Sequence, residues 1–290
     1  MHMSIAGKLG SGKSTISNIL KAKYGFQTYS TGAIQREIAQ NNKVSTLEMN
    51  RLMAKDISFD HAIDDAVTKI SVERAEEVII FDSRMAWKFA VNSFKIFVTV
   101  DPLEAASRVI KSRRGKEETY ADLEEAKLKL FERSRLENER FKEIYGVDNF
   151  DYSNYNLIID STYLAPDMLA DIVYSKYQAY CNSSDKMNVV ALSPASLYPL
   201  KEVKDINTET INKYRKERTY LHDHVTITVF DGYHYIIDGH HRVLAALLNE
   251  EDLITVKPAD TEEFPLIKET ERSTLHDFEK AGNFQYKSYP

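Results

Sequence analysis

Gly7-Lys-Leu-Gly-Ser-Gly-Lys-Ser14 is the stretch that decides the fold of this chain. It matches the phosphate-binding P-loop pattern G-x-x-x-x-G-K-[ST] at every defined position. The apolar run 3–6 leads into it as a short buried strand, and residues 14–20 open a helix with one apolar face. Glycines in such a loop let backbone N–H groups close around phosphates, and the helix N-terminus adds a favourable dipole. A glycine-rich turn in an unrelated α/β protein is the alternative, and the strand–loop–helix order disfavours it.

The loop predicts a site for ATP and Mg²⁺. Lys13 is expected to reach the β- and γ-phosphates, and Ser14 is expected to ligate Mg²⁺. The full nucleotide-binding set expected from the motif is Gly7, Gly10, Ser11, Gly12, Lys13, Ser14 and Thr15.

The composition is that of a globular protein, with 43% hydrophobic and 28% charged residues in a chain of 290. This length favours two domains. No apolar run approaches the roughly 20 residues of a membrane span, and the first strand begins too early to leave room for a signal peptide. Cys181 is the single cysteine, which excludes an internal disulfide and fits a reducing compartment. We therefore expect a cytoplasmic protein without a membrane partner.

Charge is spread unevenly along the chain, whose net charge is −6. Residues 187–290 carry 12 Lys and Arg against 17 Asp and Glu, whereas residues 1–186 carry 26 against 27. Neither part has the basic excess that is typical of a dedicated DNA-binding domain.

Residues 1 to about 180 alternate between strand and helix patterns, which predicts a parallel sheet covered by helices on both faces. The expected strands are 3–6, 27–29, 78–82, 94–100 and 156–160. The expected helices are 13–23, 47–56, 60–74, 102–113, 121–144 and 166–180. We predict an α/β domain over 1–182, followed by a short polar linker at 182–186.

A different pattern follows the linker and predicts a small α+β domain over 187–260, with a tail at 261–290. Asp231-Gly232, between strands expected at 226–230 and 233–238, is a hairpin signal. A further strand is expected at 188–192, helices at 208–218 and 239–249, and a last strand at 254–257.

Arginines and one aspartate occupy positions in the first domain where phosphoryl transfer needs them. Transfer spreads negative charge over oxygens, and the rigid fork of arginine binds phosphate in a bidentate way. Asp82 ends the strand expected at 78–82 and Arg84 follows it, at the carboxyl end, where open α/β sheets place ligands. Asp82 is a candidate partner of Mg²⁺ or of the acceptor, and a helix N-cap is its structural alternative.

Further arginines lie in three places. Arg36 follows Ser30-Thr31-Gly32 past the second strand, and Arg133 and Arg140 lie two turns apart on one helix face. A cluster next to a lid-like segment contains Arg108, Arg113 and Arg114. Each arginine alone fits a solvated surface charge, but the set favours a phosphate site.

Four segments of the first domain resemble cytidylate kinases, particularly those of the archaeal type. They are residues 4–39 with Tyr-Ser-Thr-Gly-Ala-Ile-Gln-Arg, Phe81-Asp-Ser-Arg-Met-Ala-Trp87 with Arg108 to Arg113, 132–148, and 156–160. The likeness covers nearly all of residues 1–180. Ser83 stands where that family more usually has glycine, and Gln35 replaces a commonly bulky apolar residue.

The resemblance implies a P-loop nucleoside monophosphate kinase fold with a lid and assigns roles to individual residues. Lys13 and Ser14 would bind ATP·Mg, with Asp82 as the second metal-site residue. The implied catalytic set is Lys13, Asp82, Arg84, Arg113, Arg133 and Arg140, of which Arg113, Arg133 and Arg140 would belong to the lid. The implied acceptor-binding set is Ser30, Thr31, Gly32, Arg36 and Arg84.

Asp238-Gly-His-His-Arg242 follows an apolar strand and opens a helix, so a second helix N-terminus is available to an anion. His240, His241 and Arg242 could add donors. Two alternatives compete: a merely structural helix start, and a metal site with His222 and His224, which no i,i+4 pair or cysteine supports.

Residues 197–203 and 235–247 resemble the ParB/sulfiredoxin-like fold, and within it the archaeal free serine kinases. The likeness covers about residues 188–258. It implies a nucleotide-phosphate site at Asp238, Gly239, His240, His241 and Arg242, and places Glu202 in the position of a base.

The sequence leaves several functions open. The first is an ATP-dependent kinase acting on a nucleotide or nucleotide-like acceptor. The others are a bifunctional kinase that also phosphorylates a small hydroxyl such as free serine, a kinase of hydroxymethylated bases in DNA or ParB-type DNA binder, and a non-catalytic nucleotide sensor. The expected partners are accordingly a nucleotide substrate, DNA in one alternative, and a second nucleotide at the C-terminal domain.

Overall fold

The computed structural model describes residues 1–31, 58–111, 120–184, 188–199 and 207–259. The chain divides into two compact units, Met1–Asn188 and Val189–Pro290, which we call unit 1 and unit 2. The division falls next to the polar segment 182–186 in which the sequence predicts a linker.

Unit 1 is built on five parallel strands in the order β2-β3-β1-β4-β5. Their bounds are β1 His2–Gly7, β2 Gln27–Ser30, β3 Ile79–Asp82, β4 Ser93–Thr99 and β5 Leu157–Asp160. All five strands lie within two residues of their predicted bounds. Parallel strands need crossover helices, so the predicted α/β fold with flanking helices is confirmed for this unit.

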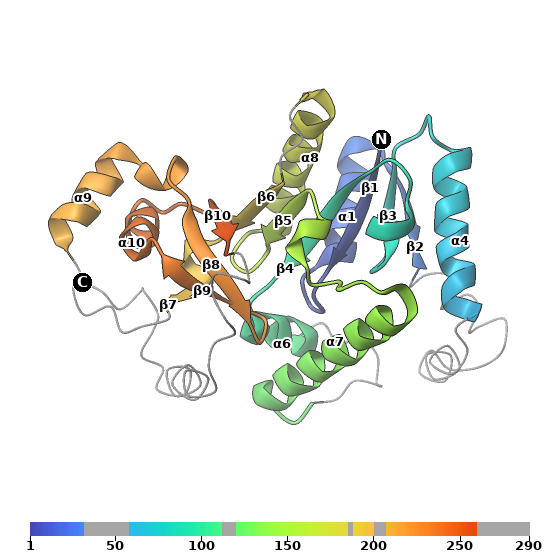
Figure 1. Cartoon of the computed structure of the whole chain (residues 1–290), viewed down its shortest axis with the longest axis horizontal. Helices are drawn as coiled ribbons and strands as arrows, with labels where there is room; N and C mark the ends of the chain where they lie inside the picture. The colour runs from blue at the N-terminus through green and yellow to red at the C-terminus, as the bar shows by residue number, and fades with distance from the viewer. Residues whose placement is uncertain (32–57, 112–119, 185–187, 200–206, 260–290) are drawn as a thin grey trace. The chain divides into compact units, whose positions relative to one another are not determined.

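Helices connect these strands (Figure 1). Their bounds are α1 Lys13–Tyr24, α4 Ser58–Glu73, α5 Ala86–Phe89, α6 Pro102–Lys111, α7 Leu123–Tyr145 and α8 Pro166–Asn182, with a 3-10 turn, η1, at Tyr152–Asn154. The sequence analysis missed α5, which has only four residues. The helix predicted at 47–56 and the end of the one predicted at 102–113 lie outside the described residues.

Local signals set the two ends of α7, the longest helix described. The side chain of Asp122 accepts a hydrogen bond from the backbone N–H of Glu125 and so caps the first turn. Gly146 ends the helix in the left-handed conformation, with φ 65°. This fixed frame carries Arg133 and Arg140, two of the predicted site residues.

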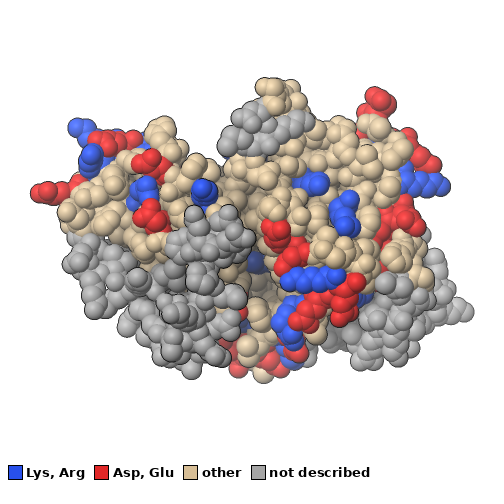
Figure 2. All heavy atoms as spheres, viewed as in Figure 1, with Lys and Arg blue, Asp and Glu red and all other residues tan. Residues whose placement is uncertain are grey.

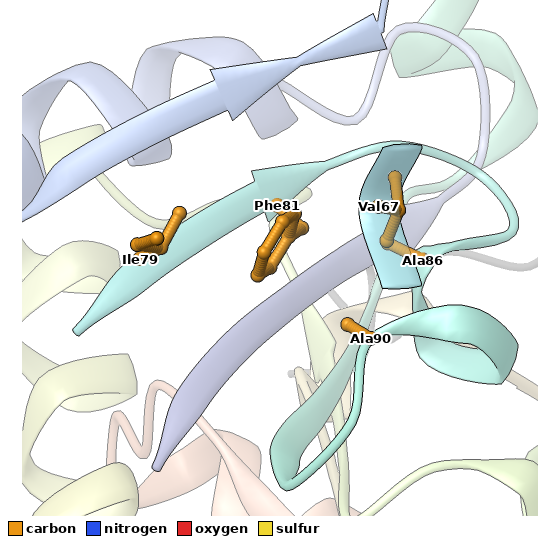
Figure 3. Packing of buried hydrophobic residues seen from close by; sticks show 5 residues of the cluster. All are labelled: Val67, Ile79, Phe81, Ala86 and Ala90. Atoms are coloured by element: carbon orange, nitrogen blue, oxygen red, sulfur yellow. The ribbon is translucent and has the colours of Figure 1, made fainter. Parts of the chain in front are cut away.

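A cluster of buried residues joins α4 and α5 to the sheet (Figure 3). Ile79 and Phe81 alternate along β3 and therefore point to the same face. On that face they pack with Val67 of α4 and with Ala86 and Ala90 at α5. This packing fixes β3, whose last residue is Asp82, beneath α4.

Unit 2 contains a mixed sheet in the order β6-β10-β8-β9-β7. Its strands are β6 Val189–Leu192, β7 Leu197–Pro199, β8 Val225–Phe230, β9 Tyr233–Asp238 and β10 Ile254–Pro258. The remaining elements are α9 Thr208–Glu217, α10 His240–Leu248 and the 3-10 turns η2 Pro194–Ser196 and η3 Thr219–Leu221. The sequence analysis missed β7 and both turns.

The hairpin predicted in unit 2 is confirmed, since β8 and β9 pair in the antiparallel sense around Asp231-Gly232. Both turn residues have positive φ, 47° and 83°, as a two-residue hairpin turn of this kind requires. The same turn directs β9 toward Asp238 and the start of α10.

Charges of both signs are interspersed on the face of the molecule shown in Figure 2, where Lys and Arg side chains of the described residues lie beside Asp and Glu side chains. No helix within the described ranges is long and apolar enough to cross a bilayer.

Candidate active site

The P-loop has a backbone that only glycine allows at two positions. Gly7 and Gly10 have φ 146° and 76°, in the region that side chains disfavour. A Cβ on Gly7 would lie 2.2 Å from the carbonyl oxygen of Val98, and one on Gly10 would lie 2.8 Å from that of Ala105. The loop therefore packs closely against β4 and α6. This packing fixes the orientation of its backbone N–H groups.

Lys13 lies across this loop. Its Nζ donates hydrogen bonds to the carbonyl oxygens of Gly7 and Lys8, at 2.9 and 2.8 Å. Gly12, with φ 81°, precedes it and caps α1 in the left-handed conformation. The ammonium group is thus kept at the loop, next to the N-terminus of α1.

Ser14 and Asp82 form a pair of hard oxygen ligands. The hydroxyl of Ser14 donates to Oδ2 of Asp82 at 2.8 Å. β1 and β3 bring them together, since Ile5 pairs with Asp82 in the parallel register. Hydroxyl and carboxylate oxygens are what Mg²⁺ prefers, so the donor set fits the ion that the motif implies.

The loop also fits a bound phosphate by a second criterion. The hydroxyl of Ser11 is buried and has no hydrogen-bond partner among the residues that the structure describes. Buried polar atoms normally have partners, and a phosphate oxygen would supply one.

Arg84 and Arg133 share one carboxylate, that of Glu137. Arg84 forms an ion pair with Glu137 across the tertiary structure, and Arg133 reaches the same side chain from one turn earlier on α7, at 3.1 Å. Sequence analysis missed Glu137, because its i,i+4 spacing from Arg133 is that of an ordinary surface pair.

Burial, together with Arg133 and Arg140, lowers the pKa of Arg84 to about 9. The guanidinium therefore stays protonated at neutral pH, in a place where three positive charges are close to one another. Such a place favours an anion with more than one charge, as a phosphate carries.

A small pocket lies between the P-loop and Arg84. Its wall contains Arg84, three residues of the loop, and six residues of α7 and the segment after it. The complete lining is Gly7, Lys8, Leu9, Arg84, Ser134, Glu137, Asn138, Phe141, Asn149 and Phe150. The structure thus brings Gly7 of the predicted donor side and Arg84 of the predicted acceptor side to one pocket, and the other described residues of these two sets do not line it.

Lys8 is a second residue that the sequence analysis did not single out. Its Nζ donates to the carbonyl oxygen of Val100 at 3.3 Å. Burial lowers the pKa of Lys8 to about 8, and Asp160 and Asp101 oppose this shift. The side chain lies behind the loop, at the carboxyl ends of β4 and β5.

Arg108, which the sequence analysis grouped with the lid arginines, is hydrogen-bonded to the segment that follows β5. Its Nη2 donates to the carbonyl oxygens of Ser161 and Thr162, at 2.6 and 3.0 Å, and its Nε donates to Glu104 at 2.9 Å. In this structure Arg108 fixes that loop.

The other predicted residues of unit 1 divide into two groups. Ser30 ends β2 opposite Asp82 in the parallel register, with Thr31 next to it, and Thr15 is exposed on α1. Gly32, Arg36 and Arg113 lie outside the described residues, as does Glu202 of unit 2.

In unit 2 the predicted strand–turn–helix around Asp238 is present. Gly239, with φ 102°, connects β9 to α10. Arg242 donates from Nη2 to Asp238 at 2.6 Å, and His241 Nε2 accepts the backbone N–H of Asn207 at 3.2 Å. Within the described ranges, no group of three metal-ligating side chains is found, at His222 and His224 or elsewhere.

Two atoms of this turn are buried without a partner among the described residues: Nε2 of His240 and Nε of Arg242. Burial lowers the pKa of His240, and Asp238 acts in the opposite direction. The turn therefore holds two buried polar atoms that make no hydrogen bond in the described part of the chain.

Comparison with known sequences places unit 1 in a family. The sequence profile of the cytidylate kinase-like family matches residues 2–163, more than half of the chain. A cytidylate kinase of Sulfolobus acidocaldarius is 32% identical over 174 residues, which are 60% of this chain and 92% of that protein. A cytidylate kinase of Methanosarcina mazei is 34% identical over 164 residues, 56% of this chain and 87% of that protein. With the P-loop, Lys13 and the Ser14–Asp82 pair in place, the chain is an ATP-dependent kinase that belongs to the cytidylate kinase-like family.

Proposed function

We propose that unit 1 transfers the γ-phosphoryl group of ATP to the phosphate of a pyrimidine nucleoside monophosphate, with CMP or dCMP as the acceptor. The observation that carries the proposal is the meeting of the P-loop with Arg84 and Glu137 in one pocket, with Arg133 and Arg140 close to Arg84. The names of the relatives support a cytidine nucleotide as the acceptor.

On the donor side, the P-loop glycines orient backbone N–H groups toward the phosphates and Lys13 balances their charge. Ser14 and Asp82 would hold Mg²⁺, which neutralises charge on the β- and γ-phosphates of ATP when bound. The proposed nucleotide-binding residues are Gly7, Gly10, Ser11, Gly12, Lys13, Ser14 and Thr15.

On the acceptor side, Arg84 binds the phosphate of the monophosphate, and Arg133 and Arg140 stabilise the charge that develops between donor and acceptor. The carboxylate of Glu137 and the acceptor phosphate are both anions that compete for the guanidinium of Arg84, so Glu137 releases Arg84 when the phosphate binds. We also assign to the acceptor side four residues beyond the described ranges or at their edge: Ser30, Thr31, Gly32 and Arg36, with Arg113 in the lid.

The reaction is a single displacement at phosphorus. An oxygen of the acceptor's phosphate forms a bond to the γ-phosphorus, and the bond from that phosphorus to the β–γ bridging oxygen breaks, which leaves ADP and a nucleoside diphosphate. No protein group has to form a covalent bond, so the residues act by position and charge.

One assay tests the acceptor. Full-length protein with radiolabelled ATP and Mg²⁺ is offered CMP, dCMP, UMP, AMP, free serine, and DNA with or without hydroxymethylated bases. We expect rapid labelling of CMP or dCMP, which Lys13→Ala should slow by roughly 10²–10³-fold. Labelling of modified DNA or serine in preference to every monophosphate would contradict the proposal and favour one of the alternatives that the sequence leaves open.

We infer that unit 2 is a ParB/sulfiredoxin-like domain that binds a phosphate-bearing ligand at Asp238, Gly239, His240, His241 and Arg242, and we assign Glu202, which lies outside the described residues, the role of its base. The buried unpartnered atoms of His240 and Arg242 at the N-terminus of α10 support this. Calorimetry on the full-length protein with ADP should detect two sites, and Arg242→Ala should remove one of them. ADP binding that is unchanged by Arg242→Ala would contradict the inference.

A further inference from the structure

One face of α4 changes character along its length. Asp60, Asp64, Val67 and Ser71 follow one another at intervals of three or four residues and so form one stripe. Val67 belongs to the apolar cluster in Figure 3, and Asp64 and Ser71 are buried as well. The first half of this stripe therefore consists of the carboxylates of Asp60 and Asp64, and the second half consists of the buried residues Val67 and Ser71.

These carboxylates meet the last turns of α7. Oδ1 of Asp60 accepts a hydrogen bond from Nη2 of Arg140 at 3.2 Å, and Asp64 accepts one from the hydroxyl of Tyr145. The side chain of Asp60 is 12% exposed and that of Arg140 is 31% exposed. A charge pair at this depth is screened less than a surface pair.

The ion pair between Asp60 and Arg140 compensates for repulsion among neighbouring arginines. Arg140 is close enough to Arg84 to lower its pKa, together with Arg133, so the three guanidinium groups repel one another. Glu137 compensates Arg84 and Arg133. In the described part of the chain, Asp60 supplies the compensating charge for Arg140.

The geometry leaves Arg140 available to a ligand. One Nη2 contact occupies one of the five N–H donors of a guanidinium group. Oδ2 of Asp60 is buried and makes no hydrogen bond to any described residue, so Asp60 holds Arg140 through a single oxygen. A one-point contact fixes where the guanidinium lies and spares the fork that binds phosphate in a bidentate way.

We propose that Asp60 is a positioning residue for phosphoryl transfer: from α4 it holds the guanidinium of Arg140 within the arginine cluster, against the repulsion of Arg84. This inference rests on the proposed function, because it assigns to Arg140 a role toward the transferred or accepting phosphate. It adds α4 to the elements that build the site and makes an acidic residue part of an anion-binding arrangement.

A purely structural role would give a different pattern. If Asp60 only tied α4 to α7, its loss would lower stability and affect all kinetic constants together. If it acts through Arg140, its loss affects the steps in which Arg140 takes part, and removing both residues costs no more than removing Arg140.

The test is a double-mutant cycle on full-length protein, with CMP as the acceptor and Asp60→Ala, Arg140→Ala and the double variant compared by KM and kcat. Asp60→Ala should raise KM for CMP or lower kcat by about tenfold, with KM for ATP unchanged. The double variant should match Arg140→Ala. Asp60→Glu should restore part of the loss, since it restores the charge. Asp65→Asn, an exposed carboxylate on the same helix, is the matched control and should behave as wild type.

The outcomes separate the two proposals. Failure of the wild-type protein to phosphorylate CMP, dCMP or any other monophosphate would overturn the proposed function and this inference with it. Two results in an active wild-type background would overturn the positioning role alone. One is that the effects of Asp60→Ala and Arg140→Ala are additive, and the other is that Asp60→Ala raises KM for ATP as much as KM for CMP.

Discussion

The hydroxyl of Ser14 donates a hydrogen bond to Oδ2 of Asp82 at 2.8 Å, although 68 residues separate them in the chain. Ser14 lies in the first turn of α1 and Asp82 is the last residue of β3. Their contact depends on the parallel pairing of β1 with β3. The serine of the P-loop therefore meets a carboxylate that a neighbouring strand supplies.

Lys13→Ala should lower kcat by roughly 10²–10³-fold, because the variant lacks the charge that the P-loop places beside the transferring phosphate. The melting temperature should stay close to that of the wild type, since Lys13 is bonded to loop carbonyls and is not part of the core. Lys21→Ala, an exposed lysine on the same helix, is the control. Wild-type turnover by Lys13→Ala would show that the reaction occurs elsewhere.

Gly7→Ala should cost about 2–5 kcal/mol in the free energy of unfolding, because its Cβ would meet the backbone of Val98 in a conformation that already disfavours side chains. Gly146→Ala also places a side chain at positive φ, but in open space, and should cost about 1 kcal/mol. Urea unfolding of both variants measures the difference. Equal losses would mean that Gly7 does not touch β4 as described.

Arg84→Ala should raise KM for the acceptor by roughly 10- to 100-fold and leave KM for ATP unchanged, as expected for one charge-assisted contact of about 1.5–3 kcal/mol. Arg135→Ala is the control on α7, since Arg135 pairs with Glu139 on an exposed surface. Steady-state kinetics with each substrate varied in turn will check this. A matching rise in KM for ATP would place Arg84 on the donor side instead.

Asp64→Asn should stabilise the protein in a pH-dependent way. Burial raises the pKa of Asp64 to about 6, with Asp60 acting in the same direction and the Tyr145 hydroxyl opposing it. The folded state thus binds a proton that the unfolded state releases above about pH 4, so wild-type stability falls as pH rises from about 4 to 6.

Asparagine does not ionise, so the melting temperature of Asp64→Asn relative to wild type should increase across that window and level off above it. Thermal melts at a series of pH values measure the trend. A difference between Asp64→Asn and wild type that is the same at every pH would exclude a raised pKa at Asp64.

Sequence analysis predicted the P-loop and the strand-end residues because their placement follows from local rules. Gly7, Gly12 and Lys13 are required by the backbone and chemistry of a single loop. Asp82 is the last residue of a buried strand and Arg84 follows it, and the carboxyl end of such a strand must lie at the ligand edge of a parallel sheet. These inferences need no knowledge of how distant helices pack.

The carboxylates that accompany the arginines could not be predicted in the same way. Glu137 has the spacing of an ordinary surface pair with Arg133, and only the packing of α7 against the loop after β3 brings Arg84 to it. Asp60 lies in the first turn of α4, where acidic residues are common because of the helix dipole, and Asp64 lies one turn further on. Their contacts with Arg140 and Tyr145 depend on the tertiary packing of α4 against α7, which the sequence pattern does not reveal. The helix α5 was missed because four residues are too few to show helical periodicity.

The first strand has a consequence for motion. All six residues of β1 are buried, and β3 and β4 flank them on either side. Amide protons in such a strand exchange with solvent only when the sheet itself opens, so β1 should be among the last segments of unit 1 to exchange deuterium. The P-loop therefore follows directly from one of the most protected strands of unit 1. Motions that admit or release a nucleotide must then involve the helices around the loop, because β1 stays fixed in the sheet.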